Sequence, residues 1–337
     1  MQQSGKTWIV AEIGQAHDGS LGILHSMIEA AAGAGVDAVK FQMHIAEAES
    51  CELEPFRINF SYVDKSRFSY WERMELSEDE WRGIKEKCDS LGVEFLATPF
   101  SNAAVDILEK IGVCRYKIGS GDLTNPLLLE KVALTGKEIV ISTGLCELSD
   151  IDAAVRIARK HNCPIAILQC TTQYPTEARN IGLPWIAELS TRYNCATGLS
   201  DHSGTIFPGI AAAALNAGMI EVHVTFDKRM FGPDSMASLT FDQLKELVIG
   251  VRFINQANTN DIKKEISDSS IELAKIFGKA LAVNRDMSKG EEITFDDLEG
   301  KKPANAGISV TKINEVLGRT LSVNKKRWEF IEENDLT

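Results

Sequence analysis

The stretch VEFLATPFSNAAVDILEKIGVCRYKIGSGDLTNPLLLEKVALTGKEIVISTG, residues 93–144, contains three short apolar runs separated by two longer amphipathic segments. The runs at 93–97, 115–118 and 138–142 have the length and the β-branched content of strands. The segments 103–111 and 127–134 repeat their apolar residues at helical spacing. The run EIVIS is apolar on both faces, which is typical of parallel strands covered by helices. The stretch therefore predicts consecutive strand–helix units.

The same unit continues on both sides of this stretch. Strands are predicted at 8–12, 37–41, 93–97, 115–118, 138–142, 164–169, 196–199 and 220–224, and helices at 21–34, 77–91, 103–111, 127–134, 151–160, 184–193, 208–217 and 242–253. Eight units in about 255 residues fit a closed parallel barrel. An open doubly wound sheet usually has a glycine-rich turn after its first strand, and Gly14-Gln15-Ala16-His17 is no such turn. We therefore predict an α/β fold, a (β/α)8 TIM barrel, over residues 1–257.

Two regions depart from the strand–helix alternation. Residues 43–74 form a long aromatic and polar insertion, and a loop of this length in a compact domain is usually functional. After Gln256 the chain becomes polar and charged, so residues 258–278 are predicted to be a linker and a short helix. Residues 279–337 are predicted to form a small, mostly β domain. Because about 60 residues make only a small core, this domain is expected to lean on another surface.

Composition excludes several classes of partner. The net charge of -12 argues against nucleic acid, since no basic face would offset it. The seven cysteines show no C-x-x-C spacing, which indicates neither a zinc site nor a disulfide framework and fits a reducing cytosol. The chain has no apolar run long enough to span a membrane, and its start lacks the pattern of a signal peptide. We expect a cytoplasmic protein.

Polar residues follow the predicted strands at one end, which in this type of barrel carries the active site. They are Glu12, Lys40, Gln42, Thr98, Lys117, Ser120, Ser142, Thr143, Cys170, Thr171, Thr172, Tyr174, Ser200, His202 and His223. A lysine inside an apolar strand needs either an anionic ligand or a buried carboxylate. Lys40 and Lys117 are therefore predicted to face an anionic ligand, although Glu12 is a possible ion-pair partner for one of them.

The serines and histidines each leave two interpretations open. Ser142 and Ser200 are suited either to capping the following helices or to binding phosphate. His202 and His223 lie far apart in sequence, as scattered polar residues do, yet neighbouring strands would bring them to one place as metal ligands. Glu12 on the first strand would then complete that site or act as a base.

These residues resemble the motifs of the sialic acid synthases, which condense phosphoenolpyruvate with an amino-sugar aldehyde. The resemblance runs through nearly the whole chain in order: Ala11-Glu12-Ile13-Gly14 with His17, Val39-Lys40-Phe41-Gln42, Thr98-Pro99-Phe100-Ser101, Tyr116-Lys117-Ile118-Gly119-Ser120-Gly121, Ser142-Thr143-Gly144, Cys170-Thr171 with Tyr174-Pro175, Gly198-Leu199-Ser200-Asp201-His202 and Gly232-Pro233-Asp234. The tail, with Lys301-Lys302-Pro303 and Gly307-Ile308, resembles the family's antifreeze-like (SAF) domain.

The resemblance implies a homodimer with a swapped C-terminal domain, in which the tail of one subunit covers the active site of the other. It implies a divalent metal held by His202 and His223, usually Mn2+, with Mg2+ or Co2+ as alternatives. Phosphoenolpyruvate would be bound by Lys40, Lys117, Ser120, Ser142, Thr172 and Ser200, and the sugar by Gln42, Tyr174, Asp234 and the partner's tail through Lys302. Glu12 would be a catalytic residue that transfers a proton, or else a structural partner of Lys40.

Departures from the family pattern gather around the sugar. The first loop reads Gln15-Ala16-His17-Asp18 where Asn is usual on both sides of the His, Thr172 stands where Asn or Ser is common, Ser235 replaces a usual His, and the tail reads Lys302-Pro303-Ala304 in place of Arg-Pro-Gly. The departures therefore leave open, in place of N-acetylmannosamine, a di-N-acetylated 6-deoxy sugar or another aldose as the acceptor. Rival functions are a phosphoenolpyruvate-aldose synthase of the heptulosonate kind, a metal-dependent aldolase on the same fold, and a non-catalytic sugar-binding barrel.

Overall fold

The computed structural model describes residues 6–258 and 265–337, so residues 259–264 of the predicted linker and the first five residues of the chain lie outside the described residues. The chain forms two compact units, residues 1–259 and 260–337. Among the described residues no helix is both long and apolar enough to cross a bilayer.

The first unit is a closed parallel barrel. Its strands are β1 (Trp8–Gly14), β2 (Ala38–Met43), β3 (Glu94–Pro99), β4 (Arg115–Ile118), β5 (Glu138–Ser142), β6 (Ile165–Cys170), β7 (Ala196–Asp201) and β8 (Met219–Thr225). Neighbours in sequence are neighbours in the sheet, and β8 pairs with β1 to close it. The predicted TIM barrel is confirmed.

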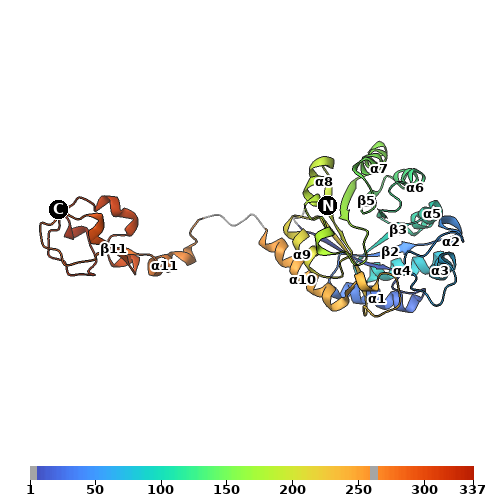
Figure 1. Ribbon diagram of the computed structural model, residues 1–337, viewed down its shortest axis with the longest axis horizontal. Helices are drawn as coiled ribbons and strands as arrows, with labels where there is room; N and C mark the ends of the chain where they lie inside the picture. The colour runs from blue at the N-terminus through green and yellow to red at the C-terminus, as the bar shows by residue number, and fades with distance from the viewer. Residues whose placement is uncertain (1–5, 259–264) are drawn as a thin grey trace. The chain divides into compact units, whose positions relative to one another are not determined.

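One helix follows each strand and lies outside the barrel (Figure 1). These helices are α1 (Leu21–Ala34), α4 (Glu78–Ser90), α5 (Asn102–Ile111), α6 (Pro126–Ala133), α7 (Leu148–Lys160), α8 (Trp185–Tyr193), α9 (Phe207–Ala214) and α10 (Phe241–Ala257). Side-chain caps fix several starts: Ser77 and Thr240 form capping boxes with Glu80 and Gln243. The insertion 43–74 is not a plain loop, because it contains α2 (Ala46–Glu49) and α3 (Arg67–Met74).

The inside of the barrel changes from apolar to polar along each strand. Side chains two residues apart share a face of a strand, so Val10 precedes Glu12 on β1, and Met219 precedes Glu221 and His223 on β8. Val10 and Met219 belong to an apolar cluster completed by Ala38, Leu96, Val140, Ala166 and Leu168. This plug closes the amino-terminal end of the barrel and leaves the polar groups at the carboxyl ends of the strands.

The second unit is small. It begins with α11 (Asp268–Phe277) and contains one antiparallel pair, β10 (Ala280–Val283) with β11 (Leu298–Lys301), and several isolated β-bridges. Nine buried apolar side chains form its core: Leu281, Val283, Met287, Ile293, Ile308, Val316, Leu321, Ile331 and Leu336. Helix α11 contributes none of them, and within this unit its Leu273, Ile276 and Phe277 are more than half exposed.

Candidate active site

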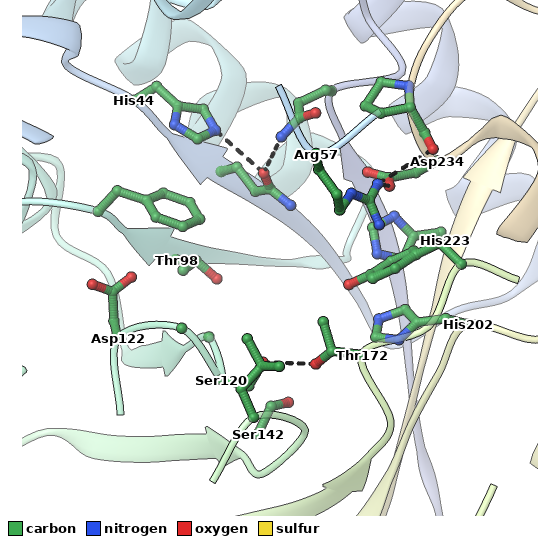
Figure 2. Close-up of a pocket in the computed structure, with 18 of the residues that line it drawn as sticks. His44, Arg57, Thr98, Ser120, Asp122, Ser142, Thr172, His202, His223 and Asp234 are labelled. Carbon is green, nitrogen blue, oxygen red and sulfur yellow. Dashed lines mark hydrogen bonds and ion pairs between the residues drawn. The ribbon is translucent and has the colours of Figure 1, made fainter. Parts of the chain in front are cut away.

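A pocket of about 350 Å³ opens at the carboxyl ends of the barrel strands. This size is typical of small-molecule sites. Eleven of the side chains predicted to form the site line it: Lys40, Gln42, Lys117, Ser120, Ser142, Thr172, Tyr174, Ser200, His202, His223 and Asp234. Figure 2 shows the two histidines and Asp234 on one side and Ser120, Ser142 and Thr172 on another. Glu12 is fully buried behind this surface, and Lys302 belongs to the second unit at the end of the β11 segment.

Two lysines and two carboxylates form the floor of the pocket. The Lys40 Nζ lies 2.5 Å from Glu12 Oε2 and 3.6 Å from Glu221 Oε1, and the Lys117 Nζ lies 3.1 Å from the same Glu221 oxygen. All four side chains are at most 5% exposed. The Lys40 ammonium also donates a hydrogen bond to Thr98. Because buried charges are costly unless paired, these four groups depend on one another.

The two lysines differ in how well their charge is balanced. Burial opposes the charge of Lys40, but Glu12 and Glu221 outweigh it and raise the pKa of this lysine. Burial lowers the pKa of Lys117, which shares its one close carboxylate with Lys40 and is repelled by that lysine. The pKa of Glu221 is lowered, because both ammonium groups outweigh the burial penalty. Lys117 therefore gains most from an anionic ligand.

Hydroxyl groups complete the floor. Among the described residues Ser142 Oγ is buried without a hydrogen-bond partner, while Ser200 Oγ donates to Glu221. Ser120 and Thr172 Oγ atoms lie 3.1 Å apart (Figure 2). The helix-capping interpretation of Ser142 and Ser200 is wrong, since the N-caps of α7 and α9 are Glu147 and Ile206. Ser142 is thus available to a ligand of the lysines, and Ser200 becomes available when its hydroxyl turns away from Glu221.

His202 and His223 lie beside each other, with ring centroids 5.2 Å apart. Nδ1 of His202 is 3.0 Å from the carbonyl oxygen of Thr171, which fixes the proton on Nδ1 and leaves Nε2 free. Burial, followed by the charge of His223, lowers the pKa of His202 to about 3, so its imidazole is neutral. Within the described residues His223 makes no hydrogen bond, although it is only 6% exposed. These are the properties of metal-ligating histidines.

The remaining ligand positions of such a metal would be open. Among the described residues no group of three or more His, Cys, Asp and Glu side chains is arranged to hold a metal ion. Glu12 does not complete the set, because its carboxylate is engaged by Lys40 and by Gln42, which donates to Oε1 at 2.9 Å. Two protein ligands with free positions suit a metal that also binds substrate.

The predicted sugar residues surround the histidines. The Tyr174 ring lies 4.1 Å from His202, centroid to centroid, and Asp234 follows β8 at the mouth. Gln42 joins Glu12 to Gln15, whose side-chain amide donates to Gln42 Oε1. Gly14 has a φ of +53°, and a Cβ there would lie 3.1 Å from Glu12 and 3.3 Å from Gln42, so glycine keeps this corner open.

Sequence reasoning missed three residues at the pocket. Glu221 is the second carboxylate of the floor, and its signal was available: two buried lysines need two carboxylates. Arg57 lies at the mouth in the insertion, where no periodicity marks it. His44 is buried, stacks between Trp71 and Phe100 and faces the pocket. His17 of the first loop is buried and is not among the pocket-lining residues.

Comparison with known proteins places the chain. The NeuB family model matches residues 27–263, which is most of the chain, and the SAF domain model matches residues 278–337. The chain belongs to the NeuB family. N,N'-diacetyllegionaminic acid synthase of Campylobacter jejuni is 35% identical over 334 residues, with 97% of this chain and 99% of that protein covered. Human N-acetylneuraminate-9-phosphate synthase is 30% identical, with 97% and 91% covered.

A solved structure agrees with this assignment. N-acetylneuraminic acid synthetase of Leptospira borgpetersenii, crystallised with citrate, superposes with a TM-score of 0.70 at 31% identity and covers 80% of this chain and 90% of its own. The expected family, the barrel with an SAF domain and the expectation of an enzyme of the sugar-acid synthase type are confirmed.

Proposed function

We propose that this NeuB-family protein condenses phosphoenolpyruvate with an amino-sugar aldehyde, giving a 2-keto-3-deoxy sugar acid and phosphate. One observation carries the proposal: donors suited to an anion lie in the same pocket as the adjacent His202 and His223. These donors are Lys40, Lys117 and Ser142, whose hydroxyl has no hydrogen-bond partner among the described residues. Charged donors of this kind bind phosphate strongly. The names of the Campylobacter jejuni and human relatives support a sialic-acid-like product.

The floor residues would bind and orient phosphoenolpyruvate. Lys117, short of a carboxylate of its own, would pair with the anionic substrate, with Ser120, Ser142, Thr172 and Ser200 donating hydrogen bonds. C3 of the enol attacks the aldehyde carbon, water adds to C2, and the C2–O bond to phosphate breaks. The water loses a proton in this sequence, and we assign Glu12 as its acceptor, with Lys40, 2.5 Å from Glu12, holding the carboxylate in place. Fixing both reactants in one pocket lowers the entropic part of the barrier.

The histidine pair would hold the metal. The neutral imidazole of His202 and the ring nitrogens that make no hydrogen bond within the described residues fit Mn2+, Mg2+ or Co2+, with the remaining positions left to substrate and water. When bound there, the metal would act as a Lewis acid on the aldehyde oxygen. Tyr174, packed against His202, and Asp234 would then orient the sugar beside the metal.

The decisive experiment combines the purified protein with phosphoenolpyruvate, Mn2+, Mg2+ or Co2+, and a panel of aldoses. The panel contains N-acetylmannosamine, a 2,4-diacetamido-2,4,6-trideoxyhexose, and the phosphorylated aldoses used by heptulosonate-type synthases. We expect phosphate release only with an acylamino aldose, and a product mass equal to phosphoenolpyruvate plus aldose plus water minus phosphoric acid. Phosphate release with no aldose consumed would refute the proposal.

Two variants test the metal assignment. Replacing His202 or His223 with Ala should abolish turnover and metal binding while the far-ultraviolet circular dichroism stays unchanged. His161→Ala is the matched control, because His161 ends α7 in contact with Glu130 and is not among the pocket-lining residues. Full activity of the His202 or His223 variant would show that the pair binds no essential metal.

The proposal includes a homodimer in which the SAF domain of one subunit covers the pocket of the other, with Lys302 as the cation that meets the sugar. The small core of the second unit and the exposed apolar side chains of α11 support a partner surface. Mixing a Lys302→Ala chain with a His202→Ala chain tests this directly. A swapped dimer restores one complete site per heterodimer, so activity should return; a lid acting within its own chain restores none.

A further inference from the structure

Arg57 lies at the mouth of the pocket and contacts two of the predicted sugar-binding residues at once. Its Nη2 donates to Asp234 Oδ1 at 2.6 Å and to the carbonyl of Pro233 at 3.3 Å. Its guanidinium carbon lies 4.1 Å above the centre of the Tyr174 ring. Figure 2 shows Arg57 between Asp234 and the two histidines. The Tyr174 ring also lies 4.1 Å from the His202 ring, centroid to centroid, so ring contacts run from Arg57 through Tyr174 to the histidine pair.

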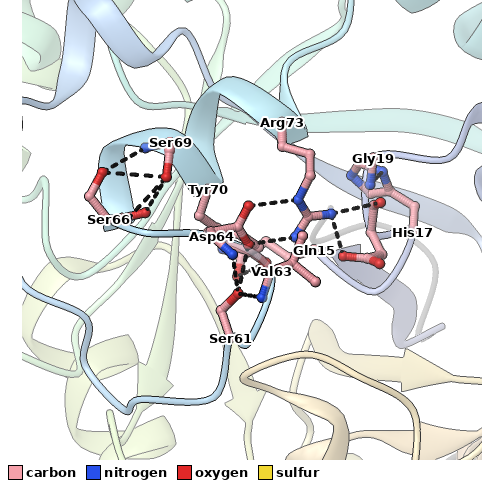
Figure 3. Close-up of polar contacts among 11 residues, drawn as sticks. Gln15, His17, Gly19, Ser61, Val63, Asp64, Ser66, Ser69, Tyr70 and Arg73 are labelled. Carbon is pink, nitrogen blue, oxygen red and sulfur yellow. Dashed lines mark hydrogen bonds and ion pairs between the residues drawn. The ribbon is translucent and has the colours of Figure 1, made fainter.

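The irregular part of the insertion that contains Arg57, residues 50–66, is fixed by two sets of contacts. In α3, Arg73 donates to both oxygens of Asp64 at 2.8 Å and to Asp18 in the loop after β1 (Figure 3). Aromatic contacts do the same on the other side, where the rings of Phe60 and Tyr62 lie 5.3 and 5.1 Å from Phe231 in the loop after β8. A side chain fixed before binding loses little freedom on binding, which is the condition for a selective contact.

The charge at the mouth is balanced. Every Lys and Arg among the described pocket-lining residues is paired with a carboxylate: Lys40 with Glu12, Lys117 with Glu221, Arg57 with Asp234 and Arg67 with Glu54. The lysine pairs lie on the floor, whereas the Arg57–Asp234 pair lies beside Tyr174, another of the predicted sugar residues. Burial raises the pKa of Asp122, a further pocket-lining carboxyl, which favours its neutral form.

We propose that Arg57 is a specificity-determining residue of the acceptor subsite: it positions Asp234 and Tyr174 for a sugar with hydroxyl and acylamino groups and, because its charge is balanced, without a phosphate. The inference deepens the proposed function and rests on it. Amide and hydroxyl groups bond to the atoms of an ion pair without needing a net charge. A phosphate at Arg57 would be repelled by the Asp234 carboxylate that pairs with this arginine, whereas on the floor Lys117 shares its one close carboxylate with Lys40.

The experiment compares Arg57→Ala and Arg57→Lys with a matched control, Arg67→Ala. Arg67 also lines the pocket, pairs with a carboxylate at 2.9 Å and lies over an aromatic ring, that of Trp71, but contacts neither Tyr174 nor Asp234. The acceptor is the panel aldose that wild type uses best. If this aldose has a 6-hydroxyl, it is tested with and without a 6-phosphate. If it lacks a 6-hydroxyl, N-acetylmannosamine and its 6-phosphate are compared instead. KM and kcat are measured for acceptor and for phosphoenolpyruvate.

We expect Arg57→Ala to raise the acceptor KM by about 10- to 100-fold, the usual effect of losing a hydrogen bond to a charged group. The KM for phosphoenolpyruvate should stay within about twofold, since such contacts are local. Arg57→Lys should recover part of the loss, because a lysine keeps the ion pair but not the planar stack. Arg67→Ala should leave both KM values within about twofold for the same reason. Wild type should prefer the unphosphorylated acceptor by at least about 10-fold.

Three results would overturn the inference: an unchanged acceptor KM in Arg57→Ala, an equal rise in both KM values, or an equal effect of Arg67→Ala. A preference for the phosphorylated acceptor would overturn its charge argument. Wild-type turnover alone decides the proposed function, so a failure there is recognised before any variant is made.

Discussion

Glu221 should matter more for the stability of the barrel than any exposed charge. Its carboxylate serves Lys40, Lys117 and Ser200, all buried at the floor of the pocket. Glu221→Gln keeps the shape and an oxygen for Ser200 but leaves two buried lysines with Glu12 alone. Removing one partner of a buried ion pair costs about 3–5 kcal/mol. For a domain of this size that lowers the melting temperature by roughly 6–20 °C.

A bound anion should restore part of the stability that Glu221→Gln loses. Inorganic phosphate or phosphoenolpyruvate bound at the floor would return a negative charge to Lys117, and a ligand at 100 times its Kd adds about 2.7 kcal/mol. Scanning calorimetry with and without either anion measures both effects. We expect the variant to gain more from the anion than wild type does.

Glu94→Gln is the control. Glu94 pairs with Arg115 at 2.6 Å at the start of β3, where both side chains are partly exposed and Arg115 keeps a second partner in Glu138. Its loss should cost no more than about 1 kcal/mol. A Glu221→Gln protein that melts within about 2 °C of wild type without any anion would refute this account of the floor, since that shift corresponds to less than about 1 kcal/mol.

Three further predictions concern other parts of the molecule. Burial, followed by the charges of His44 and Arg73, lowers the pKa of His17 to about 4. Between pH 4 and 6.5 the unfolded chain therefore binds a proton at His17 that the folded protein does not. The free energy of unfolding is unaffected above this range and decreases as the pH falls through it. In urea titrations wild type should lose about 2 kcal/mol more than His17→Asn between pH 7 and 5, and parallel curves would contradict this. A Cβ at Gly198 would lie 2.0 Å from the Met219 carbonyl oxygen, so Gly198→Ala should lose more than about 3 kcal/mol by denaturant unfolding, while Gly83→Ala, with open space around it, should lose none. Ending the chain after Asn258 should leave a folded barrel by circular dichroism without sugar turnover; turnover by that barrel would exclude the lid.

The barrel was predictable because its signal is periodic. Parallel strands buried on both faces leave apolar runs such as EIVIS, and β5 covers the residues 138–142 that this run predicted. Helix α1 also matches its predicted residues, since Ser20 caps its start and Gly35 follows its end with a φ of +91°. The insertion was harder, because α2 has only four residues and α3 packs against Phe56 and Phe60 in the irregular segment before it.

The site was only partly visible in the sequence. Lysines in apolar strands are conspicuous, and this led to Lys40 and Lys117. Glu221 is less conspicuous, because a single Glu in a strand is usually taken to face solvent. Its inward direction becomes evident only once the barrel is closed. Arg57 gave no signal at all: its role depends on contacts with Tyr174 and Asp234, which are more than 100 residues away in sequence.

Strand β8 carries Glu221 and His223 two residues apart, one for each half of the pocket. Two residues of a strand span about 6.6 Å, a length fixed by the backbone. Changes in the loops therefore cannot alter the spacing between the two halves of the pocket. The loops after β2 and β8, which carry Arg57 and Asp234, are free to diverge around it. We expect proteins that share this strand to differ in their acceptor sugar through substitutions in those loops, while the distance between Glu221 and His223 stays the same.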